Sequence, residues 1–169
     1  PIQHTSVTRG LITSDANFTT INKPFAIFGC RDGSATPDFL YNEKINADGT
    51  MVNPVQWKRS DAAKLIFYAV HPAEDNACQR ITTTSGQTPI ISFKPNEDAK
   101  LQTDLLVAKT DEFSYETDRK KKLPVNFKHA TTAIEFQIGQ DLSYNQKVKT
   151  IEILGVIGEG TYDVAAKKW

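Results

Sequence analysis

Three histidines are the side chains of this sequence best suited to hold a metal ion or to carry a proton. His4, His71 and His129 stand far apart, and none belongs to an H-E-x-x-H or H-x-H pattern that would bring two imidazoles onto one metal. Isolated histidines are more often surface or partly buried side chains than ligands. A metal site could only be assembled from distant strands, and the sequence itself predicts no bound metal.

Serine, cysteine and acidic residues offer no clearer catalytic pattern. Ser85 and Ser92 lack the strand–turn–helix context of a serine nucleophile, and Cys78 lacks the motif spacing of a catalytic thiol. The pairs Glu97–Asp98 and Asp111–Glu112 are typical of solvated loops, although a glycosidase pair cannot be recognised from sequence separation. The nine glycines form no G-x-x-x-x-G-K phosphate loop. We therefore expect no enzyme and no cofactor, with a hydrolase built from scattered carboxylates as the catalytic alternative.

Composition and charge exclude several other classes of function. The chain has 169 residues and a mass of 18.8 kDa, and its 20 basic and 20 acidic residues give a formal net charge of zero. A nucleic-acid or anionic-membrane surface would need clustered excess base. Arg119–Lys122 is the one basic run, and its acidic neighbours favour a solvated loop over a polyanion site. The longest apolar stretches, such as Leu65–Val70, are far shorter than the roughly 20 residues of a membrane helix.

Length and cysteine content favour one globular domain over residues 1–169. Hydrophobic residues make up 39% and charged residues 24% of the chain, which is typical of globular proteins. Cys30 and Cys78 can form at most one disulfide, and we expect two thiols instead. The sequence starts at Pro1 without a basic and apolar leader, so we expect any export signal of the parent to have been removed or to lie outside it.

Strand patterns recur along the chain, whereas helix patterns are scarce. Leu65–Val70 is apolar on both faces and predicts a central strand that is covered on both sides. Asp48-Gly49 predicts a type I′ hairpin turn, whose two central residues both need positive φ. The other strands expected in this half are Phe25–Phe28, ended by Gly29, then a strand from Phe39 to the turn, a returning strand over Thr50–Val55, and Ile90–Phe93.

The second half of the chain carries two stretches with strand-like alternation. Ala133–Ile138 places Ile134, Phe136 and Ile138 on one face. Val148–Ile157 alternates less cleanly around a glycine, which predicts a bulge. The remaining expectations are a strand or helical turn over Asp104–Ala108, an exposed connection over Glu112–Lys122, a last strand or tail over Tyr162–Trp169, and a short helix at Ala62–Lys64 or Asp98–Leu106.

These short strands, without long alternating helices, predict the fold class. About eight strands at close spacing are typical of an all-β, antiparallel sandwich with Greek-key connections and at most short helices. Aromatic residues could add a binding surface to such a sandwich. Trp57, Tyr68 and Trp169 could form a sugar platform, although core packing explains Tyr68 at least as well.

Four segments form a pattern in their order and spacing. They are Trp57 followed by Leu65–Pro72, then Gln102–Ala108, then Val125–Ala130 with Ala133–Ile138, and finally Ile151–Val156 with Gly160–Asp163. Together they resemble the strand signatures of the Bacteroidales fimbrillin-like family, over most of the chain from Val7 to Trp169. The resembling part is the N-terminal domain of a two-domain subunit, so we expect residues 1–169 to be one domain of a longer fimbrial subunit.

The resemblance implies a fold, a location and a mode of assembly. It implies a transthyretin-like sandwich from an exported, usually lipidated precursor that is associated with the outer membrane and assembled into cell-surface fimbriae with a role in adhesion. A trypsin-like, arginine-specific protease would remove an N-terminal strand, and a strand of the next subunit would take its place. Val7–Gly10 resembles such a processing site, with Arg9 before the cut and Gly10 after it.

Two departures from the family leave an alternative open. The sequence shows no lipidated cysteine near its start, and the second domain, which often supplies the donor strand, is absent. The alternative is a surface lipoprotein domain that binds glycan or host protein without polymerising. Both interpretations place partners outside the cell and neither involves nucleic acid.

Overall fold

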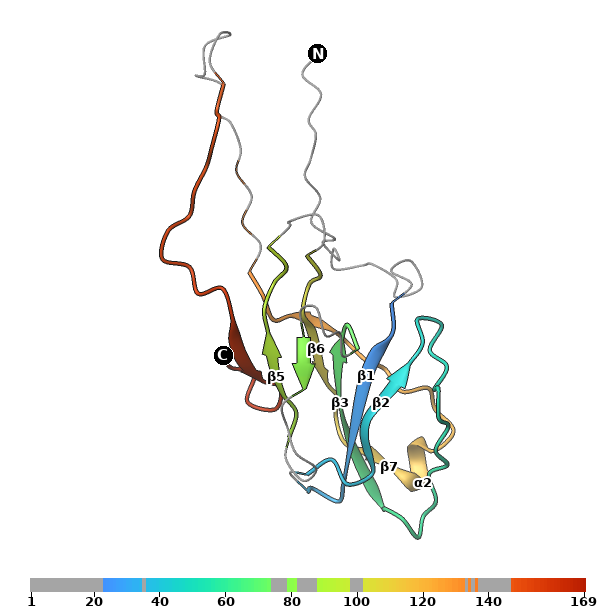
Figure 1. Cartoon of the computed structure of the whole chain (residues 1–169). Coiled ribbons are helices and arrows are strands. Elements are labelled where there is room, and N and C mark those ends of the chain that lie inside the picture. Colours follow the sequence, from blue (N-terminus) through green and yellow to red (C-terminus); the bar gives the residue numbers. More distant parts are fainter. Residues whose placement is uncertain are drawn as a thin grey trace.

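The fold is described from a computed structural model, which places residues 23–34, 36–73, 79–81, 88–97, 102–132, 134, 136 and 147–169. These residues form short strands and one helical turn (Figure 1). The elements are β1 (Phe25–Arg31), β2 (Leu40–Ile45), β3 (Lys64–His71), β4 (Gln79–Ile81), β5 (Ile90–Phe93), β6 (Leu106–Lys109), β7 (Phe113–Ser114), α2 (Tyr115–Asp118), β8 (Lys128–His129) and β9 (Gly160–Asp163). Within this part of the chain no helix is long and apolar enough to cross a membrane.

The strands form two antiparallel sheets. The larger sheet has the order β2-β1-β3-β6-β8, and β7 also pairs with β3, at the opposite end of that strand from β6. The smaller sheet has the order β4-β5-β9. Every pair among the described strands is antiparallel. The predicted all-β, antiparallel sandwich is confirmed, and the helix among the described residues, α2, is one turn long.

One core lies between the two sheets. In β1 and β3 the residues with even numbers point into it, because side chains alternate between the faces of a strand. The smaller sheet supplies the opposite wall through β5 and β9. The buried members are Ala26, Phe28, Cys30, Tyr68, Val70, Ile91, Phe93, Leu105, Val107, Tyr162 and Val164.

A second core covers the other face of the larger sheet. Phe25, Ile27, Leu65, Phe67 and Ala69 point to this side and are buried there. Loop residues rather than a third sheet cover them, and these are Met51, Trp57, Leu123, Val125 and Phe127. Strand β3 is therefore buried on both faces, as its continuous apolar run predicted.

The predicted end of the first strand at Gly29 is wrong. Strand β1 continues to Arg31, and the register with β2 shifts between Ile27 and Gly29. A Cβ atom at position 29 would lie 3.1 Å from the Phe39 ring and 3.2 Å from the Phe67 ring. The glycine thus permits two aromatic rings to approach the strand closely, and it does not interrupt the strand.

The turn after β2 also differs from the prediction. Only Gly49 has positive φ, at 84°, so the turn at Asp48-Gly49 is not of type I′. The Asp48 carboxylate instead accepts a hydrogen bond from the Thr50 backbone N–H at 2.8 Å. The returning strand is reduced to a single bridge between Ile45 and Met51, because the chain then leaves the sheet to cover the second core.

The two stretches with strand-like alternation in the second half are not strands where the structure describes them. Ile134 and Phe136 are 51% and 54% exposed and lie outside any strand. Residues 147–159 are also exposed and unpaired with any described strand, and Figure 1 shows them outside the two sheets. Their alternation defines a face, but a strand also needs a neighbouring strand to pair with.

The short helix lies at a different place from the one expected. Ala62–Lys64 is not helical, and neither is the described part of Asp98–Leu106. Helix α2 falls inside Glu112–Lys122, which was predicted as an exposed connection and also contains β7. Of the two open predictions, Asp104–Ala108 forms a strand over Leu106–Ala108, within β6. Tyr162–Trp169 is strand only over Tyr162–Asp163, the end of β9, and turns follow it.

Candidate functional site

The outer edge of strand β6 is only partly paired. Strand β8 matches Leu106 with His129 and Val107 with Lys128, and it ends there. Since hydrogen bonds to one neighbour fall on alternate residues of an antiparallel strand, the bond from the Ala130 N–H to the Leu105 carbonyl places positions 105, 107 and 109 on this edge. The backbone N–H and C=O of Lys109 therefore face outward.

No backbone hydrogen bond covers that position from the described part of the chain. The register would set Asn126 opposite Lys109, but no backbone bond joins the two residues. The opposite edge of β6 is fully engaged, since the Thr110 N–H donates to the Phe67 carbonyl at 2.9 Å beyond the end of the β3 pairing. An exposed strand edge of this kind can accept a further strand.

A cleft of about 490 Å³ lies beside this edge. It runs from β6 and β8 of the larger sheet to β9 and the turn after it in the smaller sheet, so it opens where the sandwich is not closed. Its apolar lining is formed by Val107, Phe113, Pro124, Tyr162 and Val164, and its polar lining by Lys109, Thr110, Asp111, Asn126, Lys128, His129 and Lys167, with Ala108 completing it.

The rim of the cleft is basic. Lys109, Lys128 and Lys167 are exposed, whereas Asp111 is the one carboxylate among the lining residues. The Nζ atom of Lys109 lies 5.5 Å from the centre of the Tyr68 ring, a cation–π contact that holds its stem against the sheet. The cleft thus combines an apolar floor, an unpaired strand edge and excess positive charge.

Trp169 bridges the two sheets at one end of this region. Its indole N–H donates a hydrogen bond of 2.8 Å to the Ala130 carbonyl, just beyond β8. Its ring lies edge to face with Tyr162 of β9, with centroids 5.1 Å apart. The chain reaches this position because Lys168 bridges back to Asp163. Although Trp169 is 57% exposed, its hydrogen bond and its ring contact connect the two sheets.

The carboxylate of Asp104 fixes the end of β8. One oxygen bonds Nδ1 of His129, and the other accepts a hydrogen bond from the Thr131 hydroxyl. Nδ1 of His129 is therefore already engaged by the Asp104 carboxylate. Among the residues that the structure describes, no group of three or more His, Cys, Asp or Glu side chains could hold a metal ion.

His71 and Cys30 are buried and unsuited to surface chemistry. His71 is fully buried at the end of β3, where burial and the nearby Lys23 charge lower its pKa to about 4 against a smaller opposite effect of Asp104. Cys30 is a free, buried thiol, and burial raises its pKa to about 11. It confirms the expected thiol at one of the two cysteines, and neither side chain is placed or charged for catalysis.

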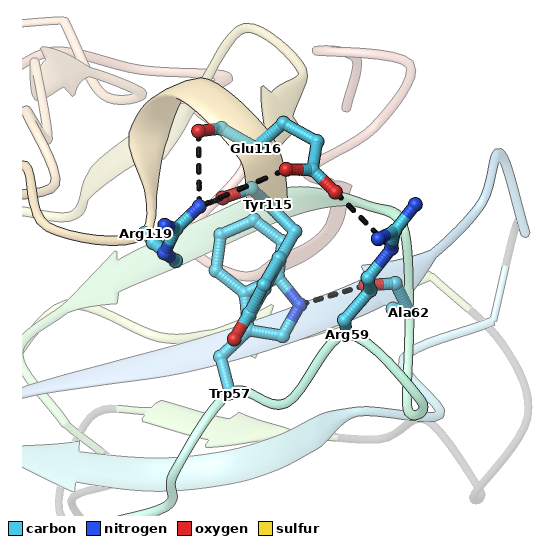
Figure 2. Close-up of polar contacts among 6 residues, drawn as sticks. All are labelled: Trp57, Arg59, Ala62, Tyr115, Glu116 and Arg119. Atoms are coloured by element: carbon cyan, nitrogen blue, oxygen red, sulfur yellow. Dashed lines mark hydrogen bonds and ion pairs between the residues drawn. The ribbon is translucent and has the colours of Figure 1, made fainter.

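The three residues considered as a sugar platform do not share one surface. Tyr68 is buried in the core between the sheets, and Trp57 packs on the opposite face of the larger sheet. Figure 2 shows Trp57 donating its indole N–H to the Ala62 carbonyl at 2.9 Å and lying against Tyr115, 5.3 Å between centroids. The platform prediction is wrong because strand alternation sends Tyr68 inward and away from Trp57.

A small polar cluster holds α2 against the loop that contains Trp57. Arg119 stacks over the Tyr115 ring at 5.2 Å and donates to the Tyr115 and Glu116 carbonyl oxygens. The Glu116 carboxylate pairs with Arg59 at 3.1 Å (Figure 2). The basic run that begins at Arg119 is therefore a solvated turn with local partners, as its acidic neighbours predicted.

Other residues singled out in the sequence are scattered or lie outside the described residues. Arg9 and Gly10 belong to the latter group, as do Cys78, Ser85 and Asp98. Glu97 is exposed, and Glu112 pairs with Lys64 at 2.6 Å on the surface. The open β6 edge and its cleft were missed by sequence reasoning. The signal that could have indicated them is Pro124, which lacks an N–H and so discourages pairing just before a strand.

The described residues form an antiparallel β-sandwich with a partly unpaired strand edge. A family model described as fimbrillin-like matches residues 8–169. The chain therefore belongs to the fimbrillin-like family, whose members serve as structural fimbrial subunits at the cell surface and contact other such subunits. No curated protein and no solved structure matches the chain.

Proposed function

We propose that this chain is the N-terminal domain of a fimbrial subunit, a pilin or a tip or accessory pilin, that joins its neighbours by strand addition and contributes to adhesion. The observation that carries the proposal is the unpaired outer edge of β6 beside an apolar cleft. A strand added there pairs with the backbone of Lys109 and sets side chains against Val107, Tyr162 and Val164. Main-chain hydrogen bonds then supply affinity, and the apolar floor supplies specificity.

A removable N-terminal strand would keep this edge from pairing too early. Pro1–Arg9 spans at most roughly 30 Å when fully extended, which is enough to cover an edge and its cleft. A trypsin-like protease that cuts between Arg9 and Gly10 would release the segment on the cell surface. The vacated backbone groups and apolar surface would then favour a donor strand from another subunit.

The proposed location follows from the same mode of assembly. The subunit would be exported as a precursor, lipidated in its parent form, and associated with the outer membrane until it enters a fimbrium. The assembled fibre would then bind host protein or glycan. The domain acts through its shape and pairing edges, and no step of this proposal requires an enzyme activity or a cofactor.

Controlled proteolysis of the full-length subunit tests this function. We expect an arginine-specific protease to cut after Arg9 and to convert the subunit into ladders that resist detergent. The matched control is Arg9→Lys, which keeps the charge but removes the recognised side chain, and which should stay monomeric. A wild-type subunit that is cut after Arg9 and remains a stable monomer would contradict the proposal and favour the non-polymerising alternative. A glycan array would then test that alternative directly.

A further inference from the structure

We propose that a cluster around α2 restricts the arginine-specific protease to Arg9, because it holds two other surface arginines in closed turns (Figure 2). The members of this α2 cluster are Trp57, Arg59, Ala62, Tyr115, Glu116 and Arg119. The inference rests on the proposed function, which requires that the protease releases Pro1–Arg9 and leaves the rest of the domain uncut. Protection of the domain is a separate property, since strand addition by itself would not spare any other arginine.

The chain has five arginines, and each is a possible cleavage site for such a protease. Arg31 lies in β1 and Arg80 lies in β4, where the backbone is paired with a neighbouring strand. Arg59 and Arg119 lie outside the strands, and their side chains are 76% and 41% exposed. Since side-chain exposure would make both of them cleavage sites, any protection has to come from the way their backbone is held.

The backbone around Arg59 forms a closed turn. The N–H groups of Asp61 and Ala62 both donate to the Lys58 carbonyl, at 3.0 and 3.4 Å. The Trp57 indole N–H donates to the Ala62 carbonyl at 2.9 Å, so this side-chain bond spans the whole turn (Figure 2). Proteolysis of a folded protein proceeds through a locally opened form. These three hydrogen bonds must therefore break before the chain is cut after Arg59.

Arg119 lies in a second turn, directly after α2. In this turn the Lys121 N–H donates to the Asp118 carbonyl at 2.8 Å. The Arg119 guanidinium lies over the Tyr115 ring at 5.2 Å, and it donates to the carbonyl oxygens of Tyr115 and Glu116 (Figure 2). The side chain is thus folded back onto its own helical turn. A protease must detach it from the ring and from both carbonyls before it can bind the guanidinium.

Tyr115 connects the two turns. Its ring lies edge to face with Trp57, 5.3 Å between centroids, and it also contacts the Arg119 guanidinium. The Glu116 carboxylate is shared as well, since one oxygen lies 3.1 Å from Arg59 and the other lies 3.8 Å from Arg119. Exposed ion pairs contribute little to stability, whereas aromatic contacts contribute more. The protection should therefore depend on the Tyr115 ring and the turn bonds rather than on Glu116.

Site-resolved proteolysis of the full-length subunit tests the inference. The subunit is treated with an arginine-specific protease, and mass spectrometry follows the cut after each arginine over time. In the wild type we expect cleavage after Arg9 to be complete while Arg59 and Arg119 stay uncut. Trp57→Phe removes the hydrogen bond to Ala62 and keeps a ring, so it should speed cleavage after Arg59 about fivefold, which corresponds to about 1 kcal/mol.

Variants in α2 separate the ring contacts from the ion pairs. Tyr115→Ala should speed cleavage after both Arg59 and Arg119 by at least about tenfold, because it removes the ring that the two turns share. Glu116→Gln is the matched control at the neighbouring position. It should change either rate by less than about twofold, since its ion pairs are largely exposed.

Cleavage after Arg31 distinguishes local opening from global unfolding. Arg31 pairs with Leu65 within the larger sheet, so opening of the α2 cluster alone should leave this site uncut. Gly29→Ala destabilises the domain from a position outside the α2 cluster. This variant should raise the cleavage rates after Arg31, Arg59 and Arg119 together, whereas Tyr115→Ala should raise only the last two.

The outcomes separate this inference from the proposed function. Rapid cleavage after Arg59 or Arg119 in the folded wild type would overturn the inference, and so would unchanged rates in Tyr115→Ala. An equal increase after Arg31 in Tyr115→Ala would assign the effect to global unfolding and overturn it too. The proposed function is decided independently, by whether the subunit forms detergent-resistant ladders once it is cut after Arg9.

Discussion

The indole N–H of Trp169 donates a 2.8 Å hydrogen bond to the carbonyl oxygen of Ala130, and this bond ties the smaller sheet to the larger one. Trp169 is anchored on β9 by its edge-to-face contact with Tyr162, whereas Ala130 follows β8 directly. The link therefore holds the two sheets together next to the cleft.

Trp169→Phe should lower the free energy of unfolding by about 1 kcal/mol, because it removes the hydrogen bond to Ala130 and keeps a ring against Tyr162. Trp169→Ala should lower it further by removing the ring contact as well. Urea unfolding of both variants measures the difference, with the exposed Lys149→Ala as the matched control. Equal stability of wild type and Trp169→Phe would show that the bond does not join the sheets.

Gly29→Ala should destabilise the domain by about 1–3 kcal/mol, since its Cβ would meet the Phe39 and Phe67 rings at 3.1 and 3.2 Å. Gly158→Ala is the control, because nothing lies within 4 Å of a Cβ there. Thermal unfolding of the two variants should separate them by several degrees. A neutral Gly29→Ala would mean that both rings can move aside without loss of packing.

Stability should fall in mild acid because of His71. Its folded pKa of about 4 lies below the ordinary histidine pKa of 6.5, so the unfolded chain binds the extra proton. The neutral form contributes stability that is complete above pH 6.5 and is lost as the pH falls toward 4, by at most roughly 3 kcal/mol. Urea midpoints over this range measure the loss. His71→Gln should flatten the pH dependence, whatever its stability at neutral pH, and an unchanged slope would rule out this origin.

The cluster around α2 should depend on its aromatic contact more than on its ion pair. Glu116→Gln should change stability by no more than about 0.5 kcal/mol, because both Glu116 and Arg59 are largely exposed. Tyr115→Ala should cost more, since it uncovers Trp57 and removes the ring under Arg119. Chemical unfolding of the two variants, together with Trp57 fluorescence, measures both effects. A larger loss in Glu116→Gln would reverse this assignment.

The fold could be predicted from the sequence where a residue pattern is compatible with only one kind of structure. The continuous apolar run of β3 can only be stable with both faces covered, and the two cores cover it. It failed where the outcome depends on distant partners. Ile134 and Phe136 alternate as a strand would, yet they are exposed, because periodicity defines a face and says nothing about which strand pairs beside it.

The cleft beside β6 could not be predicted from the sequence for the same reason. Lys109 and Tyr162 are 53 positions apart in the sequence, and only the meeting of β6 with β9 brings both to one cleft. The outward direction of the Lys109 backbone follows from the strand register, which no local signal in the sequence specifies. Arg9 and Gly10 remain a prediction from the family resemblance.

Amide hydrogen exchange at Lys109 tests the central claim most directly, because strand addition at the β6 edge must engage this N–H. In the subunit cut after Arg9 but not yet assembled, the amide should exchange as an open edge does. In detergent-resistant ladders its exchange should slow by at least about a hundredfold, as expected for a paired strand. Fast exchange at Lys109 in fully assembled ladders would contradict the account and place the joint between subunits elsewhere.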